Sequence, residues 1–174
     1  MPEFWNAYTA AGELTDTVLI RGEQIPKGLY HLVCEVLVRH IDGSFLCMKR
    51  SADKEFFGGY YEATAGGSAL LGETPLVCMK RELLEETGIF CEEFTEIGRR
   101  VIEESEAIFY NYICTVDCDK SAVSLQEGET EGYTWMSEAE FVSFINSGEM
   151  IETQKRRYLP YFKAQGWIKK IILA

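Results

Sequence analysis

The segment from Tyr30 to Arg39 constrains the fold of this chain more than any other stretch of its 174 residues. It is almost continuously apolar and rich in β-branched side chains, which is typical of a largely buried strand. The Asp42-Gly43 pair predicts a turn, and Phe45–Arg50 is expected to return as the second strand of a long hairpin. A chain of this length can bury most of its apolar surface in one unit, so residues 1–174 are expected to form a single domain.

Alternating or apolar runs predict further strands on both sides of this hairpin. They are Phe4–Thr9, Thr17–Arg21, Tyr60–Ala65, Ile97–Glu103, Ala107–Val116 and Gly132–Met136. Because helical segments interrupt these strands, the pattern favours a mixed α/β sandwich.

The helices are predicted from their end signals. Residues 75–87 are expected to be helical, because Thr74 is a sound N-cap and Gly88 can take the left-handed cap conformation. The capping box that begins at Ser137 predicts a second helix, which ends before Gly148. A third helix is expected from near Thr153, and Pro160 would end or kink it.

The composition restricts the partners and the location of the chain. A net charge of −11 argues against binding of a nucleic-acid polymer, which depends on clustered Lys and Arg. Six cysteines without a C-x-x-C pair, beside two histidines, indicate buried thiols rather than a zinc site. The N-terminus lacks the layout of a signal peptide and the apolar runs are too short to span a membrane, so a cytoplasmic location is expected.

The predicted helix at 75–87 carries a cluster of glutamates on one side. Glu82, Glu85 and Glu86 stand at i, i+3 and i+4 and so share an arc of about 100°. These carboxylates repel one another, and two of them lie near the helix C-terminus, where negative charge is unfavourable. A bound Mg²⁺ would account for the cluster, since this ion prefers carboxylate and phosphate oxygens. The alternative reading is a solvated acidic face.

The spacing around this cluster resembles the Nudix signature over residues 67–89. The matching positions are Gly67, Glu73, Arg81, Glu82, Glu85, Glu86 and Gly88. The resemblance implies a Nudix-type α/β/α sandwich around a mixed β-sheet. It also implies Mg²⁺-dependent hydrolysis, with Mn²⁺ as a substitute ion, of a diphosphate bond in a small nucleoside- or alcohol-diphosphate-linked metabolite.

The same resemblance assigns roles to individual residues. The implied metal ligands are Glu82, Glu85, Glu86, Glu129 and the carbonyl oxygen of Gly66. The implied catalytic residues are Glu82, Glu85 and Arg81, with Glu82 as a further ligand or as the base that orients water. Structural support is expected from Gly67, Glu73 and Gly88, with Glu73 and Arg81 forming a charge-assisted pair.

Two assignments outside the signature stay open between alternatives. A glutamate from a later loop, before the strand with Trp135, is expected at the metal; Glu129 is preferred, with Glu131 and Glu127 as rivals. Lys49 and Arg50, at the end of a strand, are expected either to contact substrate phosphates or to be solvated surface cations.

Residues 4–140 also resemble, more loosely, the isopentenyl-diphosphate-isomerase-like Nudix branch. True isomerases need a cysteine and a histidine before the helix, and this chain has Ala65 and Gly67 at the matching places. A hydrolase is therefore favoured over an isomerase. The other alternative is a catalytically silent Nudix-fold ligand sensor. Residues 150–174 are expected to cap the pocket or to form a homodimer contact, with Trp167–Ala174 docked on the fold.

Overall fold

The computed structural model describes residues 2–168, which form nine strands, three α-helices and two short 3-10 helices. The strands are β1 (Phe4–Thr9), β2 (Leu14–Ile20), β3 (Leu29–His40), β4 (Phe45–Arg50), β5 (Tyr61–Glu62), β6 (Thr64–Ser68), β7 (Thr95–Ile102), β8 (Ala107–Val116) and β9 (Thr130–Met136). The α-helices are α1 (Pro75–Thr87), α2 (Glu138–Ser147) and α3 (Glu152–Ala164), and the 3-10 helices are Glu103–Ser105 and Lys120–Ala122.

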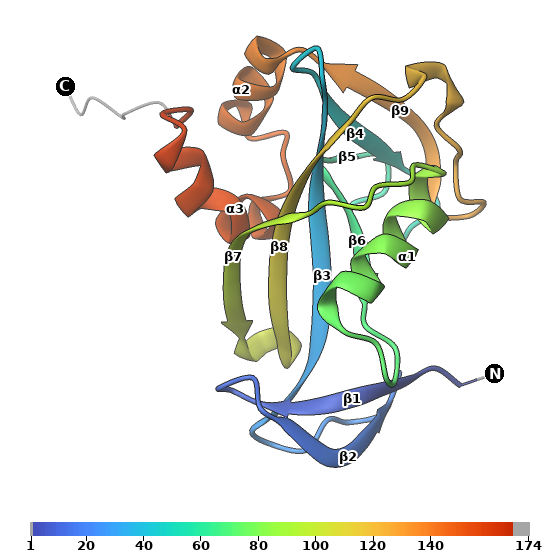
Figure 1. Ribbon diagram of the computed structural model, residues 1–174, viewed down its shortest axis with the longest axis vertical. Coiled ribbons are helices and arrows are strands. Elements are labelled where there is room, and N and C mark those ends of the chain that lie inside the picture. The colour runs from blue at the N-terminus through green and yellow to red at the C-terminus, as the bar shows by residue number, and fades with distance from the viewer. Residues whose placement is uncertain (1, 169–174) are drawn as a thin grey trace.

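Strand β3 organises the sheet (Figure 1). It pairs parallel with β8 over ten residues, His31 to His40, and antiparallel with β6. The N-terminal strand β1 pairs with the start of β3, β7 lies antiparallel beside β8, and β9 pairs with β4. Parallel and antiparallel pairs share one sheet, which confirms the predicted mixed α/β fold.

Three local predictions differ from the structure. The single strand expected at Tyr60–Ala65 is divided into β5 and β6. The long hairpin is wrong in extent, because β3 and β4 pair only at Arg39 and Phe45, while β6 and β8 take the rest of β3. The third helix does not end at Pro160 but runs on to Ala164. A proline removes only one backbone donor from the helix, and α3 gains from packing against β7 and β8.

Helices cover both faces of the sheet (Figure 1). Helix α1 packs against β6 and β3, and α3 packs against β7 and β8 on the other side. Because strand side chains alternate between faces, Cys34 and Val36 of β3 enter the core under α1. Leu37 enters the second core, with Phe141 and Phe162 of the C-terminal helices.

The predicted ends of α1 are confirmed. The Thr74 hydroxyl oxygen accepts a hydrogen bond from the Val77 amide at 3.3 Å. Gly88 has a φ of 70°, in the left-handed region, and its N–H donates to the Leu84 carbonyl at 2.8 Å. The capping box at Ser137 is also present, and α2 ends before Gly148.

The β1–β2 hairpin lies at one end of the molecule, below the loop that leads into α1 (Figure 1). It has a small core of its own, made by Trp5, Ala7, Leu19 and Ile25. The Leu71 amide, in the loop before α1, donates to the Phe4 carbonyl at 2.8 Å. This contact joins the hairpin to the loop between Gly67 and Glu73.

Three further observations concern expectations drawn from composition. All six cysteines are free, and Cys34, Cys47, Cys78 and Cys114 are buried. Within residues 2–168, no helix has the length and apolar character needed to cross a membrane. Trp167 packs against the core between the sheet and α2 and α3, whereas residues 169–174 of the segment expected to dock lie outside the described residues.

Candidate active site

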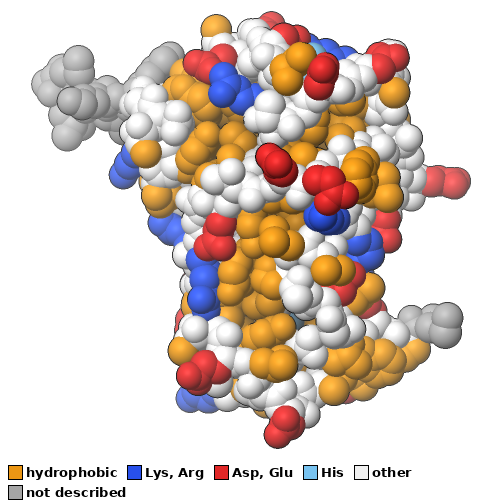
Figure 2. Space-filling model, viewed as in Figure 1, with side chains coloured by type: hydrophobic (Ala, Val, Ile, Leu, Met, Phe, Trp, Pro, Cys, Tyr) orange, Lys and Arg blue, Asp and Glu red, His pale blue; other side chains and the backbone are white. Residues whose placement is uncertain are grey.

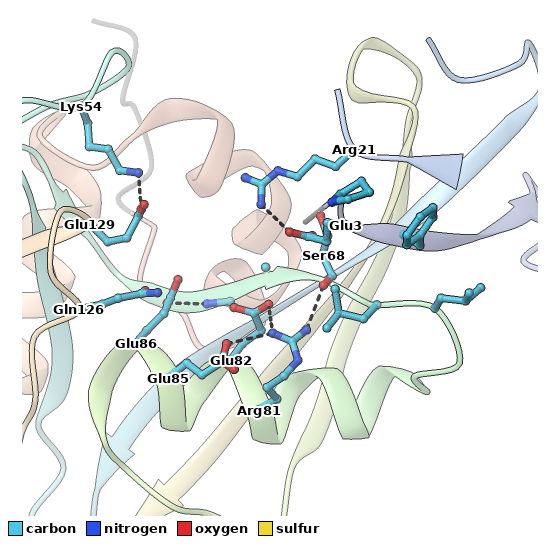
Figure 3. A pocket seen from close by; sticks show the side chains of 16 residues that line it. Glu3, Arg21, Lys54, Ser68, Arg81, Glu82, Glu85, Glu86, Gln126 and Glu129 are labelled. Carbon is cyan, nitrogen blue, oxygen red and sulfur yellow. Dashed lines mark hydrogen bonds and ion pairs between the residues drawn. The ribbon is translucent and has the colours of Figure 1, made fainter. Parts of the chain in front are cut away.

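A cavity of about 760 Å³ opens between α1, β6 and the β1–β2 hairpin (Figure 3). We call it the outer cavity. Its acidic side chains are Glu3, Glu82, Glu85, Glu86 and Glu129, and its basic side chains are Arg21, Lys54 and Arg81. The structure therefore brings together most of the residues that the sequence marked as a site.

Arg81 is the centre of the polar network on α1 (Figure 3). Its guanidinium binds Glu73 in a bidentate manner, at 2.7 and 2.8 Å, and donates to the Ser68 carbonyl at 3.1 Å. Its Nη1 also donates to Glu82 at 2.7 Å and to Glu85 at 3.1 Å. The hydrogen bond from Arg81 is the main cause that lowers the pKa of Glu73. The predicted pair is present, and it ties the loop before α1 to the helix.

Gly67 lets the Glu82 carboxylate approach the backbone of β6. A Cβ atom at position 67 would lie 2.6 Å from the Glu82 carboxylate, so the Glu82 side chain would have to move away from its present position. Burial raises the pKa of Glu82, although the hydrogen bond from Arg81 opposes the shift. Gly67 thus leaves the space that the Glu82 carboxylate occupies. Its predicted role is structural support.

Glu86 points toward β6 and is half-buried. Its Oε2 accepts a hydrogen bond from the Gly66 amide at 2.9 Å. Burial, and then the negative charges of Glu82, Glu62 and Glu129, raise the pKa of Glu86 to about 8. No Lys or Arg within residues 2–168 forms an ion pair with this carboxyl group, which is therefore short of positive charge.

The three candidates for a metal-binding glutamate outside α1 are Glu127, Glu129 and Glu131, and they lie in different places. Glu129 lines the outer cavity and pairs with Lys54. Glu131 instead pairs with Lys49 at 2.7 Å and accepts a hydrogen bond from the Ala52 amide at 3.0 Å. Glu127 is exposed and does not line the cavity. Glu129 is thus the candidate best placed for a metal, and its role stays a prediction.

Lys49 and Arg50 do not line the outer cavity. Lys49 pairs with Glu131, and Arg50 pairs with Glu62 at 2.7 Å. Their expected contact with substrate phosphates stays a prediction. The outer cavity takes its cations from Arg21 and Lys54 instead, which the sequence reasoning missed.

The two missed cations differ in how they could have been found. Lys54 is four residues after Arg50, in the loop that follows β4, so its distance in sequence from the strand end was a usable signal. Arg21 reaches the cavity only because the hairpin folds beside β6, and its partner Glu3 lies 18 positions away in sequence. No local pattern contains that information.

The donor set suits a hard divalent cation, but its side chains do not yet surround one point. In the part of the chain that the structure describes, no group of three or more His, Cys, Asp or Glu side chains is placed to hold a metal ion. The oxygens of Glu82 and Glu85 are engaged by Arg81, and an oxygen of Glu86 by the Gly66 amide. Side-chain rotation within the outer cavity would free carboxylate oxygens, which are the ligands that Mg²⁺ prefers.

The face that carries α1 has no broad basic area. Figure 2 shows acidic and basic side chains interspersed over it, with hydrophobic side chains gathered along its middle over β8. Binding of a nucleic-acid polymer depends on a continuous patch of Lys and Arg. Three cations, Arg21, Lys54 and Arg81, line the outer cavity, whose size suits a small molecule.

Comparison with known proteins identifies the family. A model described as NUDIX domain matches residues 29–162, and the chain belongs to the Nudix family. It is 31% identical over 160 residues to an uncharacterized Nudix hydrolase (lmo0368) of Listeria monocytogenes, covering 92% of this chain and 90% of that protein.

Solved structures agree with the fold. DR0079 of Deinococcus radiodurans superposes with a TM-score of 0.68 at 17% identity, covering 90% of this chain and 99% of that one. The NUDIX domain of Shewanella oneidensis NrtR, complexed with ADP ribose, gives a TM-score of 0.53 at 15% identity, covering 66% and 77%. The family and the α/β sandwich are confirmed. These similarities show the Nudix family and give no support to the isomerase-like branch, which stays a prediction.

Proposed function

We propose that this chain is a Mg²⁺-dependent hydrolase that cleaves a diphosphate bond in a small phosphorylated metabolite. One observation carries the proposal. Four carboxylates from α1 and the loop before β9 line one cavity together with three cations, and these residues are Glu82, Glu85, Glu86, Glu129, Arg21, Lys54 and Arg81. Such a mixture suits a substrate that is itself anionic and arrives with divalent cations.

The carboxylates of α1 and Glu129, with the carbonyl oxygen of Gly66, would hold the ion. Nudix proteins typically need a divalent metal. When bound, Mg²⁺ neutralises phosphate oxygens and acidifies a water molecule. The negative charge that surrounds Glu86 supports this assignment, because an added cation would relieve it.

The side chains of this chain have distinct tasks in the reaction. Arg21 and Lys54 bind phosphate oxygens and orient the substrate, and Arg81 positions Glu82 and Glu85. Glu82 accepts a proton from the attacking water, whose oxygen forms a new bond to phosphorus. The bridging P–O bond breaks, and the bridging oxygen keeps the electron pair and departs on the leaving phosphate. Burial raises the pKa of Glu82, which makes this carboxylate a better proton acceptor.

The test is the replacement of single carboxylates by amides. Glu85→Gln and Glu86→Gln should each lower kcat by about 10²–10⁴-fold on whichever diphosphate the wild-type enzyme hydrolyses with Mg²⁺. Glu152→Gln, an exposed change on α3, is the matched control and should keep full activity. Near-wild-type turnover in both α1 variants would refute the mechanism.

A ligand sensor without turnover is the second candidate. The solved NrtR domain, which was complexed with ADP ribose, shows that one protein with this fold binds a nucleotide. Tight binding of a diphosphate without product, in the presence of Mg²⁺ or Mn²⁺, would establish this alternative. Interconversion of prenyl diphosphate isomers would instead support an isomerase.

A further inference from the structure

A second cavity of about 160 Å³ lies behind the carboxylates and is more enclosed than the outer cavity. We call it the inner chamber. The two cavities share Gly66, Glu86 and Glu129 as lining residues, so they adjoin at the proposed metal ligands. The inner chamber has room for roughly five water molecules, or for one small chemical group.

Part of the chamber wall is polar and rigidly held. Gln154 of α3 is 3% exposed; its Oε1 accepts from the Ala63 amide at 3.0 Å and its Nε2 donates to the Thr64 hydroxyl oxygen at 2.6 Å. Thr64 belongs to β6, only two residues before Gly66. Side chains fixed in this way on a helix and a strand are suited to selective binding, because little ordering remains when a ligand arrives.

The ion pair of Arg50 and Glu62 supplies the other polar groups. Arg50 Nη1 donates to Glu62 Oε1 at 2.7 Å, and Arg50 Nε donates to the Phe56 carbonyl at 3.2 Å. Across residues 2–168, neither Arg50 Nη2 nor Glu62 Oε2 forms a hydrogen bond. Arg50 and Glu62 both line the inner chamber, and each keeps one polar atom that no described residue binds.

We propose that the inner chamber is a subsite for a hydroxylated group linked to the substrate diphosphate, such as the vicinal diol of a sugar. Each hydroxyl both donates and accepts, so one diol can bind the free Glu62 oxygen and the free Arg50 nitrogen together. An alkyl tail in the chamber would leave both unpaired. The substrate class is then a sugar-type diphosphate, and alkyl diphosphates are excluded. This inference rests on the proposed function, since the outer cavity must hold the diphosphate.

The test compares substrates and one variant. Wild-type enzyme with Mg²⁺ should favour ADP-ribose or UDP-glucose over isopentenyl and geranyl diphosphates by at least about 100-fold in kcat/KM. Glu62→Gln should raise KM for the preferred substrate by about ten-fold with little change in kcat, since a hydrogen bond to a charged group is weakened. The control Glu152→Gln should leave KM unchanged. Equal or better use of the alkyl diphosphates, or an unchanged KM in Glu62→Gln, would overturn the subsite.

Two further measurements distinguish failure of the proposed subsite from failure of the proposed hydrolysis. If no diphosphate is hydrolysed, calorimetric binding of ADP-ribose to wild type and Glu62→Gln still tests the chamber, and equal affinities would refute it. If Glu62→Gln does not fold, the wild-type enzyme is given ADP-ribose and an analogue whose terminal ribose carries hydrogen in place of its 2- and 3-hydroxyls. Equal kcat/KM for the pair would also refute the subsite, whereas a loss with the analogue supports it.

Discussion

Two carboxylates of this protein line the same inner chamber in opposite electrostatic surroundings. Glu35 of β3 receives a bidentate pair from Arg157 of α3, at 2.8 and 2.6 Å, and a hydrogen bond from Asn111 at 3.2 Å. The Arg157 guanidinium also lies 4.4 Å from the centre of the Phe109 ring. Glu86 of α1 has one backbone donor and is surrounded by other carboxylates.

The difference separates a structural charge from a functional one. The charge of Glu35 is neutralised within the fold, so nothing further has to bind there. The charge around Glu86 is not neutralised by the chain, and such carboxylates gather where a protein binds a cation or performs proton transfer. The charge of Glu35 is thus neutralised by Arg157, whereas no Lys or Arg within residues 2–168 pairs with Glu86.

Removing the partner of Glu35 should give the largest change in stability. Arg157→Met leaves a buried, unpaired carboxylate and should lower the free energy of unfolding by about 3–5 kcal/mol. Urea denaturation measures this change, and Arg156→Met, an exposed neighbour, should stay within about 0.5 kcal/mol of wild type. The second change Glu35→Leu, made in the Arg157→Met protein, should restore most of the loss. Equal urea midpoints for wild type and Arg157→Met would show that Arg157 does not stabilise the buried charge of Glu35.

Adding Mg²⁺ should give the next largest change in stability, and it should depend on Glu86 rather than on Glu35. An ion at 100 times its dissociation constant stabilises the folded state by about 2.7 kcal/mol, which raises the melting temperature. Arg157→Met should keep this increment, because neither Arg157 nor its partner Glu35 lines the outer cavity. Glu86→Gln should lose most of it. An identical Mg²⁺ shift in Glu86→Gln would remove Glu86 from the ion site.

The smallest expected effect is on how the free energy of unfolding of the metal-free protein varies with pH. It is small because Glu86 is only half-buried and solvent screens part of the repulsion. Its pKa is about 8 in the folded state against 4.5 as an unperturbed group. Between these values the folded state binds one more proton than the unfolded state, so stability falls as pH rises from 4.5 to 8. Unfolding midpoints in EDTA should decline over this window in wild type and decline less in Glu86→Gln. An equal decline in the two proteins would show that Glu86 is not the group responsible for this pH dependence.

Local sequence was enough to predict α1 and its carboxylates. The cap at Thr74 and the left-handed glycine at position 88 depend on residues within one helical turn. The placing of Glu82, Glu85 and Glu86 on one side follows from helix periodicity. The pair of Glu73 and Arg81, eight positions apart, could also be predicted, since both belong to one loop and helix.

The pairing partners of β3 could not be predicted in the same way. A buried strand can pair with any neighbour that offers free backbone groups, and here β6 and β8 took the places expected for β4. The same limit explains the end of α3, because the sequence shows the proline at 160 but not the packing that carries the helix past it. Such outcomes depend on competition between segments far apart in the chain.

By itself, the sequence determined that one helix would carry a cluster of carboxylates bounded by glycines, because that arrangement needs only short-range geometry. The tertiary structure alone decided what meets this cluster: Arg21 from the β1–β2 hairpin, Lys54 from a loop, and a polar chamber closed by Gln154. Gln154 binds Ala63 across 91 positions, and Arg157 binds Glu35 across 122. Contacts at that separation are set by the order of strands in the sheet, which no local pattern of residues encodes.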